Sequence, residues 1–384
     1  KEAMMNRVVA GEWVLLLTCH ETYVFVEAKA GATFRLNRDR VAVEPLLGAP
    51  YGARYQLRGG KLVRFFRSPV VVLPESGGSS SAAASQDKTQ RLDEASITEM
   101  KRSGVDGEAI VESLVEGSAT FKDKTVFSQE KYRKRKERKY LPWVRVLAPR
   151  AANVAKAFFA KGPTSKRLAV RPDAVAQLLA RSNVRAGVDV LCVDDTGGVL
   201  LGAVVERGAR VKVPFVGASP PAHDALKRFN FDKEHVATSV SYFRLGGGSG
   251  TEPPARALVV ASKRDPRSVL GALLPLLRPS SAFAVYCDVS EPFLPCVTDL
   301  RDRGCANLQL TEAWVRNFQV LPNRTHPNMV VSATGGYLLS GITTADQRSQ
   351  HAENMNAAPD IDTVLGEGVS RADGAAVSTD DAPR

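Results

Sequence analysis

From Gly187 onward, short runs rich in Val, Leu and Ala alternate with amphipathic stretches of helical length. Parallel strands need a crossover connection that is usually a helix, so this alternation predicts a doubly wound α/β sheet. The expected strands are 188–193, 210–216, 235–241, 256–261 and 282–287, and the expected helices lie near 199–207, 220–229, 266–277 and 291–303. A last strand, Val330 to Leu339, follows the long segment Trp314–Asn328 and is expected to return antiparallel. The pattern indicates a Rossmann-like domain over residues 141–343.

The N-terminal part has a different pattern. Residues 8–73 consist of short aromatic or β-branched runs separated by Gly and Asn, with Gly59-Gly60 at a hairpin position. This spacing predicts a small β-barrel-like domain over residues 1–75. The run Glu75–Ser85 that follows is rich in Ser, Gly and Ala, and it cannot bury a core.

Two further segments complete the expected domain organisation. Residues 76–140 are interpreted as a linker and a basic helical segment, in which Ser96 and Glu99 form a capping box. Residues 344–384 contain few large apolar side chains, and we expect a disordered acidic tail there.

The charge is unevenly distributed. The net charge is +11, but the chain from Gly341 onward has eight acidic residues and three Arg, a net of −5, so residues 1–340 carry +16. A body this basic indicates a polyanionic partner. Nucleic acid is expected rather than a membrane surface, because no basic amphipathic helix is evident. No apolar run approaches the ~20 residues that a membrane span needs. A generally basic, solvated surface is the alternative.

The cations are densest between Lys131 and Lys139, where seven Lys and Arg residues and one Glu occupy nine positions. Like charges repel on an isolated helix, so an anionic partner would offset that cost. RNA phosphates fit this role, and aromatic neighbours could stack on unpaired bases. Those aromatic neighbours are Phe127, Tyr132, Tyr140 and Trp143. The candidate RNA-contact residues are Lys131, Arg133, Lys134, Arg135, Lys136, Arg138 and Lys139. A solvated helix face and a nuclear localisation signal are the alternatives.

A second feature is the run Val190–Gly202, in which a strand passes through Asp194-Asp195-Thr196-Gly197-Gly198 into a helix. This layout presents backbone N–H groups to a nucleotide-type ligand. In a working S-adenosylmethionine site the next strand ends in an acid that binds the ribose hydroxyls, whereas Arg210–Val216 ends without Asp or Glu. The fourth strand ends in Ser262 and Lys263, and a lysine would repel the sulfonium cation. The sequence therefore predicts a methyltransferase-type frame that lacks a working cofactor site.

No catalytic or metal-binding set is expected in this chain. The five His are dispersed, the five Cys form no CxxC pair, and neither HExxH nor GxSxG occurs. Asp194 and Asp195 are adjacent at a strand end, where successive side chains point to opposite faces, so they are not expected to serve one site. We therefore expect no catalytic residue, no bound cofactor and no metal.

Several of these runs resemble one known family. They are Lys131–Tyr140, Asn183–Gly187, Asp194–Gly198 with Glu206-Arg207, Glu312–Pro327 and Gly335–Gly341. Together they are similar to the non-catalytic subunit of the eukaryotic tRNA (adenine-58-N1) methyltransferase over roughly residues 10–343. The stretch Trp314–Gly341 is the most specific part. Where relatives often carry a long charged insertion, this chain has a short Gly/Ser run at 246–250.

The resemblance implies a process and a partner. A catalytic subunit, a paralogue on the same fold, would bind S-adenosylmethionine and perform tRNA methylation, while this chain would have no activity of its own. The family forms a heterotetramer with two copies of each subunit, binds tRNA across both kinds and acts in the nucleus. Two other interpretations remain: a divergent active S-adenosylmethionine-dependent RNA methyltransferase, and an RNA-binding scaffold without a methyltransferase partner.

The late segment supplies the remaining candidates. Trp314, Phe318 and Tyr337 are large aromatic residues beside a late strand, where anchors of a partner interface often lie. A plain core role is the alternative for these three residues. Arg316 and Arg324 are further candidates for tRNA contact.

Overall fold

The computed structural model describes residues 6–65, 92–103, 105, 107–165, 167–216, 218–245, 254–321, 324–329 and 335–344. The chain folds into two compact units, which are described separately. Unit 1 contains residues 1–162, 224–231 and 314–334, and unit 2 contains residues 163–223, 232–313 and 335–384.

Unit 1 is built on a five-stranded antiparallel sheet in the order β2-β1-β7-β5-β6. Its strands are β1 (Trp13–Thr18), β2 (Tyr23–Glu27), β5 (Arg54–Arg58), β6 (Lys61–Phe65) and β7 (Trp143–Leu147). The hairpin β3 (Thr33–Leu36) and β4 (Asp39–Ala42), followed by the 3-10 helix η1 (Glu44–Leu46), shares the core of this sheet. Val144 and Val146 of β7 lie in that core, because alternate residues of a strand face one side. The predicted boundary at residue 141 thus falls directly before a strand at the centre of the unit 1 sheet.

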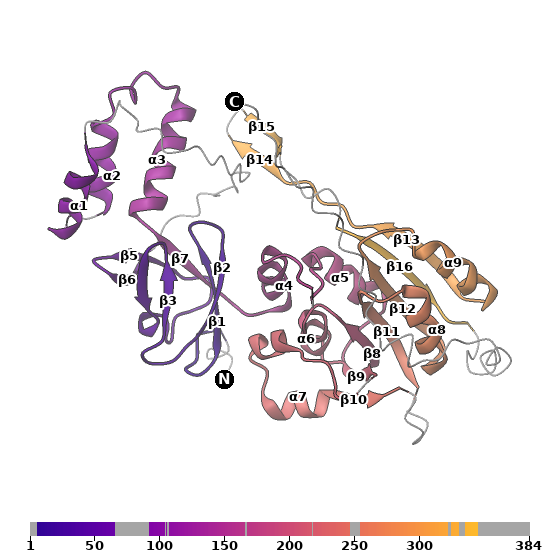
Figure 1. The fold of residues 1–384 in the computed structure, drawn as a ribbon. Coiled ribbons are helices and arrows are strands. Elements are labelled where there is room, and N and C mark those ends of the chain that lie inside the picture. Colours follow the sequence, from indigo (N-terminus) through magenta and orange to yellow (C-terminus); the bar gives the residue numbers. More distant parts are fainter. Residues whose placement is uncertain are drawn as a thin grey trace, which may run out of the picture. The chain divides into compact units, whose positions relative to one another are not determined.

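α-Helices lie between β6 and β7 in the chain (Figure 1). They are α1 (Glu94–Arg102), α2 (Gly107–Glu116) and α3 (Val126–Tyr140). Ile110 and Leu114 of α2 form a small core with Tyr140 at the end of α3. Gly107 allows this approach, because a Cβ at that position would overlap the carbonyl oxygen of Tyr140.

Segments from much later in the chain complete unit 1. They are α4 (Ala151–Ala160), η2 (Asp224–Phe229) and the hairpin β14 (Phe318–Leu321) and β15 (Arg324–Pro327). Asn230, directly after η2, accepts a hydrogen bond from the Trp13 N–H at 2.7 Å and donates one to the Trp13 carbonyl oxygen at 2.8 Å. The Arg228 guanidinium lies 3.3 Å from the centre of the Trp13 ring. These contacts hold the late segment on the first residue of β1.

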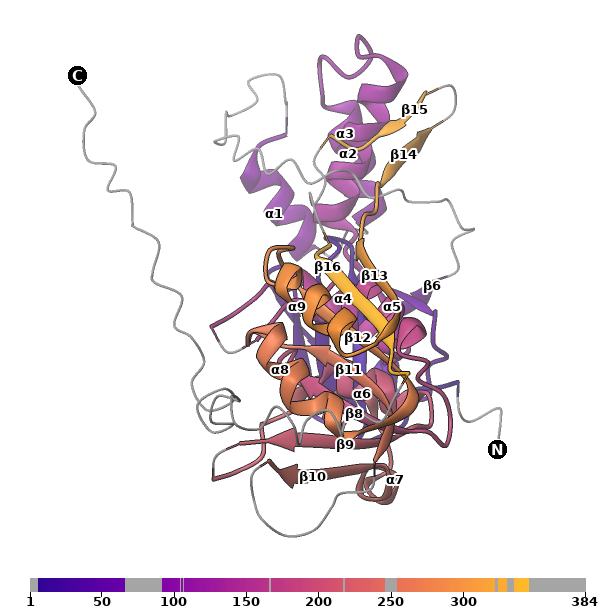
Figure 2. The same cartoon turned by 90° about the vertical axis from the view of Figure 1, so that its right-hand side faces the viewer.

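Unit 2 contains a seven-stranded sheet in the order β10-β9-β8-β11-β12-β16-β13. Its strands are β8 (Asp189–Asp194), β9 (Arg210–Phe215), β10 (Val240–Arg244), β11 (Ala255–Ala261), β12 (Leu277–Cys287), β13 (Ala306–Glu312) and β16 (Tyr337–Ile342). The strands from β10 to β12 in this order are parallel, whereas β16 runs antiparallel to both β12 and β13. α5 (Pro172–Arg181) and α6 (Val199–Glu206) cover one face, and α8 (Pro266–Leu273) and α9 (Phe293–Asp302) cover the other (Figure 2). The buried strands have continuous apolar runs, as a sheet covered on both faces requires.

The predicted α/β class and most predicted elements of unit 2 are confirmed, including the antiparallel return of the last strand. The predicted strand 235–241 is wrong, because Lys233–Ser239 form α7 and the strand begins at Val240. The β-branched residues Val236, Thr238 and Val240 alternate as in a strand, but pairing with β9 starts only where Val240 lies opposite Val211. The predicted helix 220–229 is shorter, and β13 was not predicted. Residues 330–334 of the predicted last strand lie outside the described residues.

Candidate nucleic-acid interface and Gly-rich turn

The predicted basic cluster lies on α3. Thr125 caps this helix, because its side-chain oxygen accepts a hydrogen bond from the Ser128 N–H at 3.4 Å. The helix packs on α2 through Tyr132, whose hydroxyl donates to the Leu114 carbonyl oxygen at 3.3 Å. Its last turn continues almost directly into β7, which starts at Trp143.

The expectation that the tyrosines of α3 stack on RNA bases is wrong. Tyr132 and Tyr140 are 7% and 9% exposed, because a spacing of eight residues places both on the inner side of the helix. Trp143 is half-buried, and the Arg54 guanidinium lies 5.4 Å from its ring centre. The side chain of Phe127 lies outside the described residues. The exposed side chains of α3 therefore include cations but not these two tyrosines.

Lys131, Arg133, Arg135 and Lys139 are exposed, and Lys134, Lys136 and Arg138 are half-buried. Positions i, i+3, i+4 and i+7 share one helix face. Four cations follow this spacing, and we call them the basic stripe: Lys131, Lys134, Arg135 and Arg138. Lys134 also pairs with Glu130 at 3.2 Å. Arg133 lies off the stripe, and Arg135 and Lys136 lie 5.8 Å and 5.1 Å from the ring of Tyr132.

A second group of predicted residues lies on the segment 314–329, which we call the arm. Trp314 and Phe318 are 61% and 48% exposed, and Val320 and Met329 are exposed as well. The arm is held together by the β14–β15 pairing and by a hydrogen bond from the Asn328 N–H to the Asn317 carbonyl oxygen at 2.9 Å. Arg316 is exposed, whereas the side chain of Arg324 lies outside the described residues.

Tyr337 differs from the other two aromatic candidates. It is half-buried and packs against the core of unit 2. A core role fits this residue, whereas exposed Trp314 and Phe318 fit an interface.

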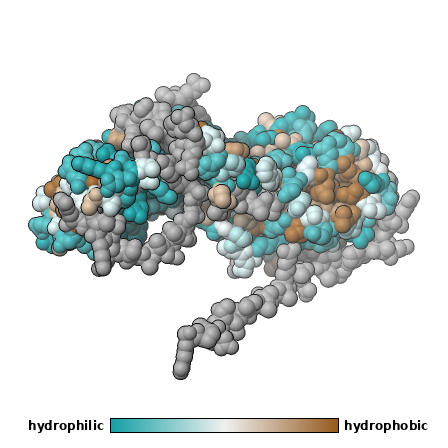
Figure 3. Space-filling view, turned by 90° about the horizontal axis from the view of Figure 1, so that it is seen from above, coloured by the Kyte–Doolittle hydropathy of each residue, from teal (hydrophilic) through white to brown (hydrophobic). Residues whose placement is uncertain are grey.

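Figure 3 shows a hydrophobic patch on one face of the surface, and the exposed apolar residues of unit 2 include Leu294 on α9 and Leu310 on β13.

The glycines that follow the arm have a packing reason. A Cβ at Gly335 would overlap the guanidinium of Arg171, which is 8% exposed and donates to the Ala313 carbonyl oxygen at 2.8 Å. Gly336 has φ +82°, and a Cβ there would lie 2.5 Å from the Tyr286 hydroxyl oxygen. The chain therefore returns to the sheet through a passage that only glycine fits.

The Gly-rich turn lies between β8 and α6 in unit 2. Asp194 is 6% exposed, and its carboxylate accepts hydrogen bonds from the Thr196 N–H at 2.6 Å and the Leu201 N–H at 2.8 Å. Burial raises the pKa of Asp194 above its ordinary value. Thr196 in turn accepts hydrogen bonds from the Val199 and Leu200 N–H groups at 3.1 Å and 3.0 Å. Four N–H groups of this turn, those of Thr196, Val199, Leu200 and Leu201, are thus bound by the protein's own side chains.

The turn is also covered by the chain. A Cβ at Gly198 would lie 2.9 Å from the Cβ of His223 and 3.0 Å from its carbonyl oxygen. His223 is 9% exposed, stacks on Tyr242 with ring centres 5.9 Å apart, and shares a hydrogen bond of 3.1 Å with the Tyr242 hydroxyl. Arg167 covers the neighbouring Gly197, with its Cδ 3.4 Å from where a Cβ would be. The sequence did not single out His223, because no local motif marks it.

Asp195 and Lys263 lie at the ends of adjacent strands. The Asp195 carboxylate accepts hydrogen bonds from the Ser262 hydroxyl at 2.7 Å and the Lys263 N–H at 2.8 Å. It therefore serves a different group from Asp194, as expected from their alternation. The Lys263 ammonium donates to the carbonyl oxygens of Thr164 and Ser165 at 2.6 Å and 2.8 Å. These contacts join the loop at 164–165 to the end of β11.

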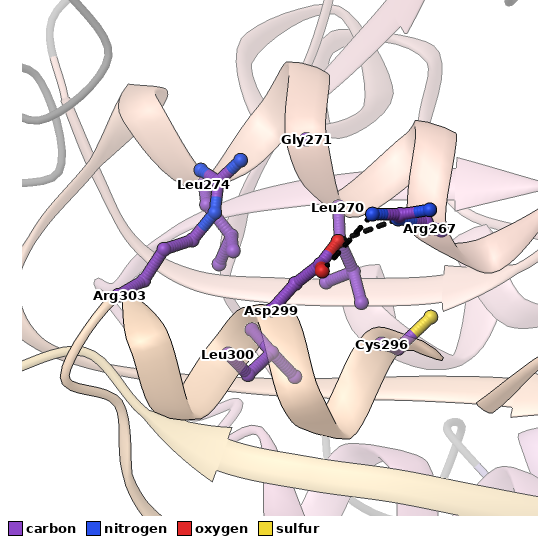
Figure 4. Close-up of a pocket in the computed structure, with 8 residues that line it drawn as sticks. All are labelled: Arg267, Leu270, Gly271, Leu274, Cys296, Asp299, Leu300 and Arg303. Atoms are coloured by element: carbon purple, nitrogen blue, oxygen red, sulfur yellow. Dashed lines mark hydrogen bonds and ion pairs between the residues drawn. The ribbon is translucent and has the colours of Figure 1, made fainter. Parts of the chain in front are cut away.

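A pocket of about 210 Å³, open in part to solvent, lies between α8 and α9 (Figure 4). Arg267 and Asp299 form a two-bond ion pair in it, at 2.6 Å and 3.1 Å. Burial raises the pKa of Cys296 to about 12, so its thiol stays protonated and is a poor nucleophile at neutral pH. Among the described residues, no group of three or more His, Cys, Asp or Glu is arranged to hold a metal, and no helix has the length and apolar character to cross a membrane.

Comparisons with known proteins agree with this architecture. The family model of the Gcd10p family matches residues 7–245. The tRNA (adenine(58)-N(1))-methyltransferase non-catalytic subunit of Mus musculus is 27% identical over 83% of this chain and 84% of that protein. The protein of the same name from Dictyostelium discoideum is 24% identical over 90% of this chain and 81% of that protein.

Solved structures show the fold. A tRNA (m1A58) methyltransferase from Aquifex aeolicus has a TM-score of 0.51 at 14% identity and covers 88% of this chain and 100% of its own. A SAM-dependent O-methyltransferase from Thermotoga maritima has a TM-score of 0.53 at 11% identity and covers 89% of this chain and 96% of its own. The fold is therefore that of a Rossmann-like methyltransferase.

Proposed function

This chain belongs to the Gcd10p family, and on that premise we propose that it is the non-catalytic subunit of a tRNA (adenine-58-N1) methyltransferase. The observation that carries the proposal is a methyltransferase fold whose Gly-rich turn is covered by the protein itself, with His223 over Gly198. Such a chain would contribute to tRNA methylation by binding and assembly rather than by chemistry.

The residues around the turn do not fit S-adenosylmethionine. A ligand that approached Gly198 would meet His223, which is buried and packed on Tyr242. The strand β9 ends in Pro214 and Phe215, with no acid to bind ribose hydroxyls. Lys263 adds a cation at the neighbouring strand end, where a sulfonium would be repelled. We therefore assign the cofactor and the chemistry to a catalytic partner subunit.

Two features support a protein partner. The arm exposes Trp314 and Phe318, and aromatic side chains are common anchors of protein interfaces. β13 is an edge strand of the seven-stranded sheet, and no strand in the described part of the chain pairs with its outer side. An exposed strand edge can pair with another chain. We propose that this side of unit 2 and the arm contact the catalytic subunit, in a heterotetramer with two copies of each subunit.

The tRNA role is assigned to the basic stripe of α3, together with Arg316 and Arg324. The cations of α3 are exposed or half-buried while its tyrosines are buried, so phosphate contacts would not require α3 to unfold or rotate. Phosphate contacts position RNA without reading its sequence. The stripe would thus hold tRNA while the partner methylates it, and we propose that this takes place in the nucleus.

Co-expression with the candidate catalytic subunit tests the function. We expect the two chains to co-purify and to methylate tRNA at adenine 58, and each chain alone to be inactive. Calorimetry should detect S-adenosylmethionine binding to the complex and none to this chain alone. Micromolar binding to this chain alone, with methylation, would instead support the divergent active enzyme. RNA binding without any association with a methyltransferase subunit would support the scaffold.

A further inference from the structure

Two segments about a hundred residues apart meet at the end of α3. The carbonyl oxygen of Arg138 has no helical donor four residues on, because Pro142 lacks an N–H. The Asn37 side-chain amide donates to this oxygen at 3.4 Å, and the Cys19 thiol lies 3.8 Å from it. His20 in turn shares a hydrogen bond of 2.8 Å with the Asn37 side-chain oxygen. The β3–β4 turn is thereby fixed against the last turn of α3, within unit 1.

This turn is itself basic. Arg35, Arg38 and Arg40 are all exposed, and Arg35 lies directly opposite Arg40 across the hairpin. Like charges opposite each other destabilise a strand pair. Arg35 donates to the Asn37 carbonyl oxygen at 3.3 Å, a contact that leaves its charge uncompensated. Such an arrangement favours an anionic ligand.

The acidic groups nearby are fewer than the cations. Asp39 lies in the turn, Glu21 lies near His20, and Glu130 and Glu137 lie on α3. Against these four acids stand eight cations from the turn and the helix: Arg35, Arg38, Arg40, Lys131, Lys134, Arg135, Arg138 and Lys139. At 1.5 Å per residue the basic stripe alone spans about 10 Å, the length of a few nucleotides.

We propose that the β3–β4 turn and the basic stripe form one continuous surface that binds the phosphate backbone of RNA. The proposal rests on the proposed function and deepens it, because it adds Arg38 and Arg40 to the tRNA-contact residues. RNA is favoured over an anionic membrane by the lack of hydrophobic anchors. Among the described side chains of 33–42 and 128–139, none is a large exposed apolar residue of the kind that a membrane-surface helix inserts.

The test uses the full chain in complex with its catalytic subunit, and it measures tRNA affinity as a function of salt. The plot of log affinity against log salt has a negative slope. Arg38→Ala/Arg40→Ala should reduce the magnitude of this slope by about 1.4–1.8, at 0.7–0.9 per phosphate contact. Lys131→Ala/Arg135→Ala should lower it by a similar amount, and the quadruple variant by about 3. The control Lys233→Ala/Arg301→Ala removes two exposed cations of unit 2 and should leave the slope unchanged.

A charge-neutral variant tests the geometry. Asn37 has φ +56°, a conformation that glycine adopts without strain. Asn37→Gly removes the tie to Arg138 and no cation, so it should weaken tRNA binding with folding retained if the two segments act together. Far-ultraviolet circular dichroism and the melting temperature report the folding. Unchanged affinity in this variant would show that the tie is dispensable and would count against a single continuous surface.

The outcomes separate this inference from the function. If the Lys131/Arg135 variant loses binding while the Arg38/Arg40 variant keeps full affinity and slope, the surface ends at α3 and the inference is wrong, although the function stands. If the wild-type complex does not bind tRNA, the function itself fails. Binding to vesicles that contain phosphatidylserine tests the membrane alternative. Vesicle binding that the Arg38/Arg40 variant abolishes, with tRNA binding unaffected, would reassign the turn to lipid headgroups.

Discussion

Gly336→Ala is expected to destabilise unit 2 for two reasons that can be separated. A residue with a Cβ at φ +82° costs roughly 1–2 kcal/mol in the left-handed region. The new Cβ would also lie 2.5 Å from the hydroxyl oxygen of Tyr286. Tyr286 is 3% exposed, and its hydroxyl donates to Asp288 at 2.9 Å, so the ring cannot move away without losing packing. Overpacking of this kind costs about 1–3 kcal/mol, which brings the total to roughly 2–5 kcal/mol.

Gly187→Ala is the matched control. Gly187 has φ +74° in the same unit, and a Cβ there would meet nothing within 4 Å, so this variant should incur only the backbone cost. Urea titrations with thiol labelling, followed by mass spectrometry of the peptide that contains Cys192, report the unfolding of unit 2. Cys192 is fully buried in β8 and becomes reactive when the sheet opens.

The two variants should therefore differ by the overpacking cost. In a Tyr286→Ala background, Gly336→Ala should cost no more than Gly187→Ala, because the clashing ring is gone. If Gly336→Ala and Gly187→Ala are equally destabilising in the wild-type background, the close approach of Gly336 to Tyr286 does not constrain the chain. A cost that persists after Tyr286 is removed would point to a different neighbour.

Two further predictions concern the turn and the arm. Burial raises the pKa of Asp194 above 3.8, so folding favours its protonated form. The resulting contribution of Asp194 to the free energy of unfolding is complete at low pH, and it is lost as pH rises through the folded-state pKa. The free energy of unfolding of the wild type relative to Asp194→Asn, measured by urea unfolding, should therefore decrease as pH rises through that pKa. A difference that does not change with pH would refute the raised pKa of Asp194. Trp314→Ala should change the free energy of unfolding by less than about 0.5 kcal/mol, because the side chain is 61% exposed. It should weaken association with the catalytic subunit about 30-fold, as the loss of an interface anchor of about 2 kcal/mol would. Calorimetric titration against that subunit measures the change, and unchanged affinity would remove Trp314 from the interface.

The strands β8 and β11 and the end of β12 could be predicted because each is a buried apolar run that needs no knowledge of its neighbours, whereas β13, most of whose residues are exposed, was missed. The basic cluster could also be predicted, because its charge is visible in a short stretch of sequence. The inward direction of Tyr132 could not, because it depends on α2 being packed against that side of α3. The segment 235–241 was misassigned because its alternating β-branched residues Val236, Thr238 and Val240 satisfy a strand pattern, while the start of β10 is set by pairing with β9.

Contacts between distant segments account for what the sequence did not reveal at the candidate site. The missing acid after β9 and the lysine at the end of β11 were visible in the sequence, and both bear on the cofactor question. The position of His223 over Gly198 was not visible, because it depends on the path of the chain after β9. The union of the β3–β4 turn with α3 was likewise hidden, since Asn37 and Arg138 lie 101 residues apart.

The interleaved path of unit 1 has a consequence for synthesis on the ribosome. Trp13 receives its partners Arg228 and Asn230 only after more than two hundred further residues have been made. A chain released after residue 162 would contain every strand of the five-stranded sheet but would leave the Trp13 end of β1 uncovered. Nascent chains with exposed aromatic surface are prone to aggregate and to recruit chaperones. We therefore expect the Trp13 surface to be exposed in N-terminal fragments that stop before Asp224, and to be covered once the chain extends beyond Phe231.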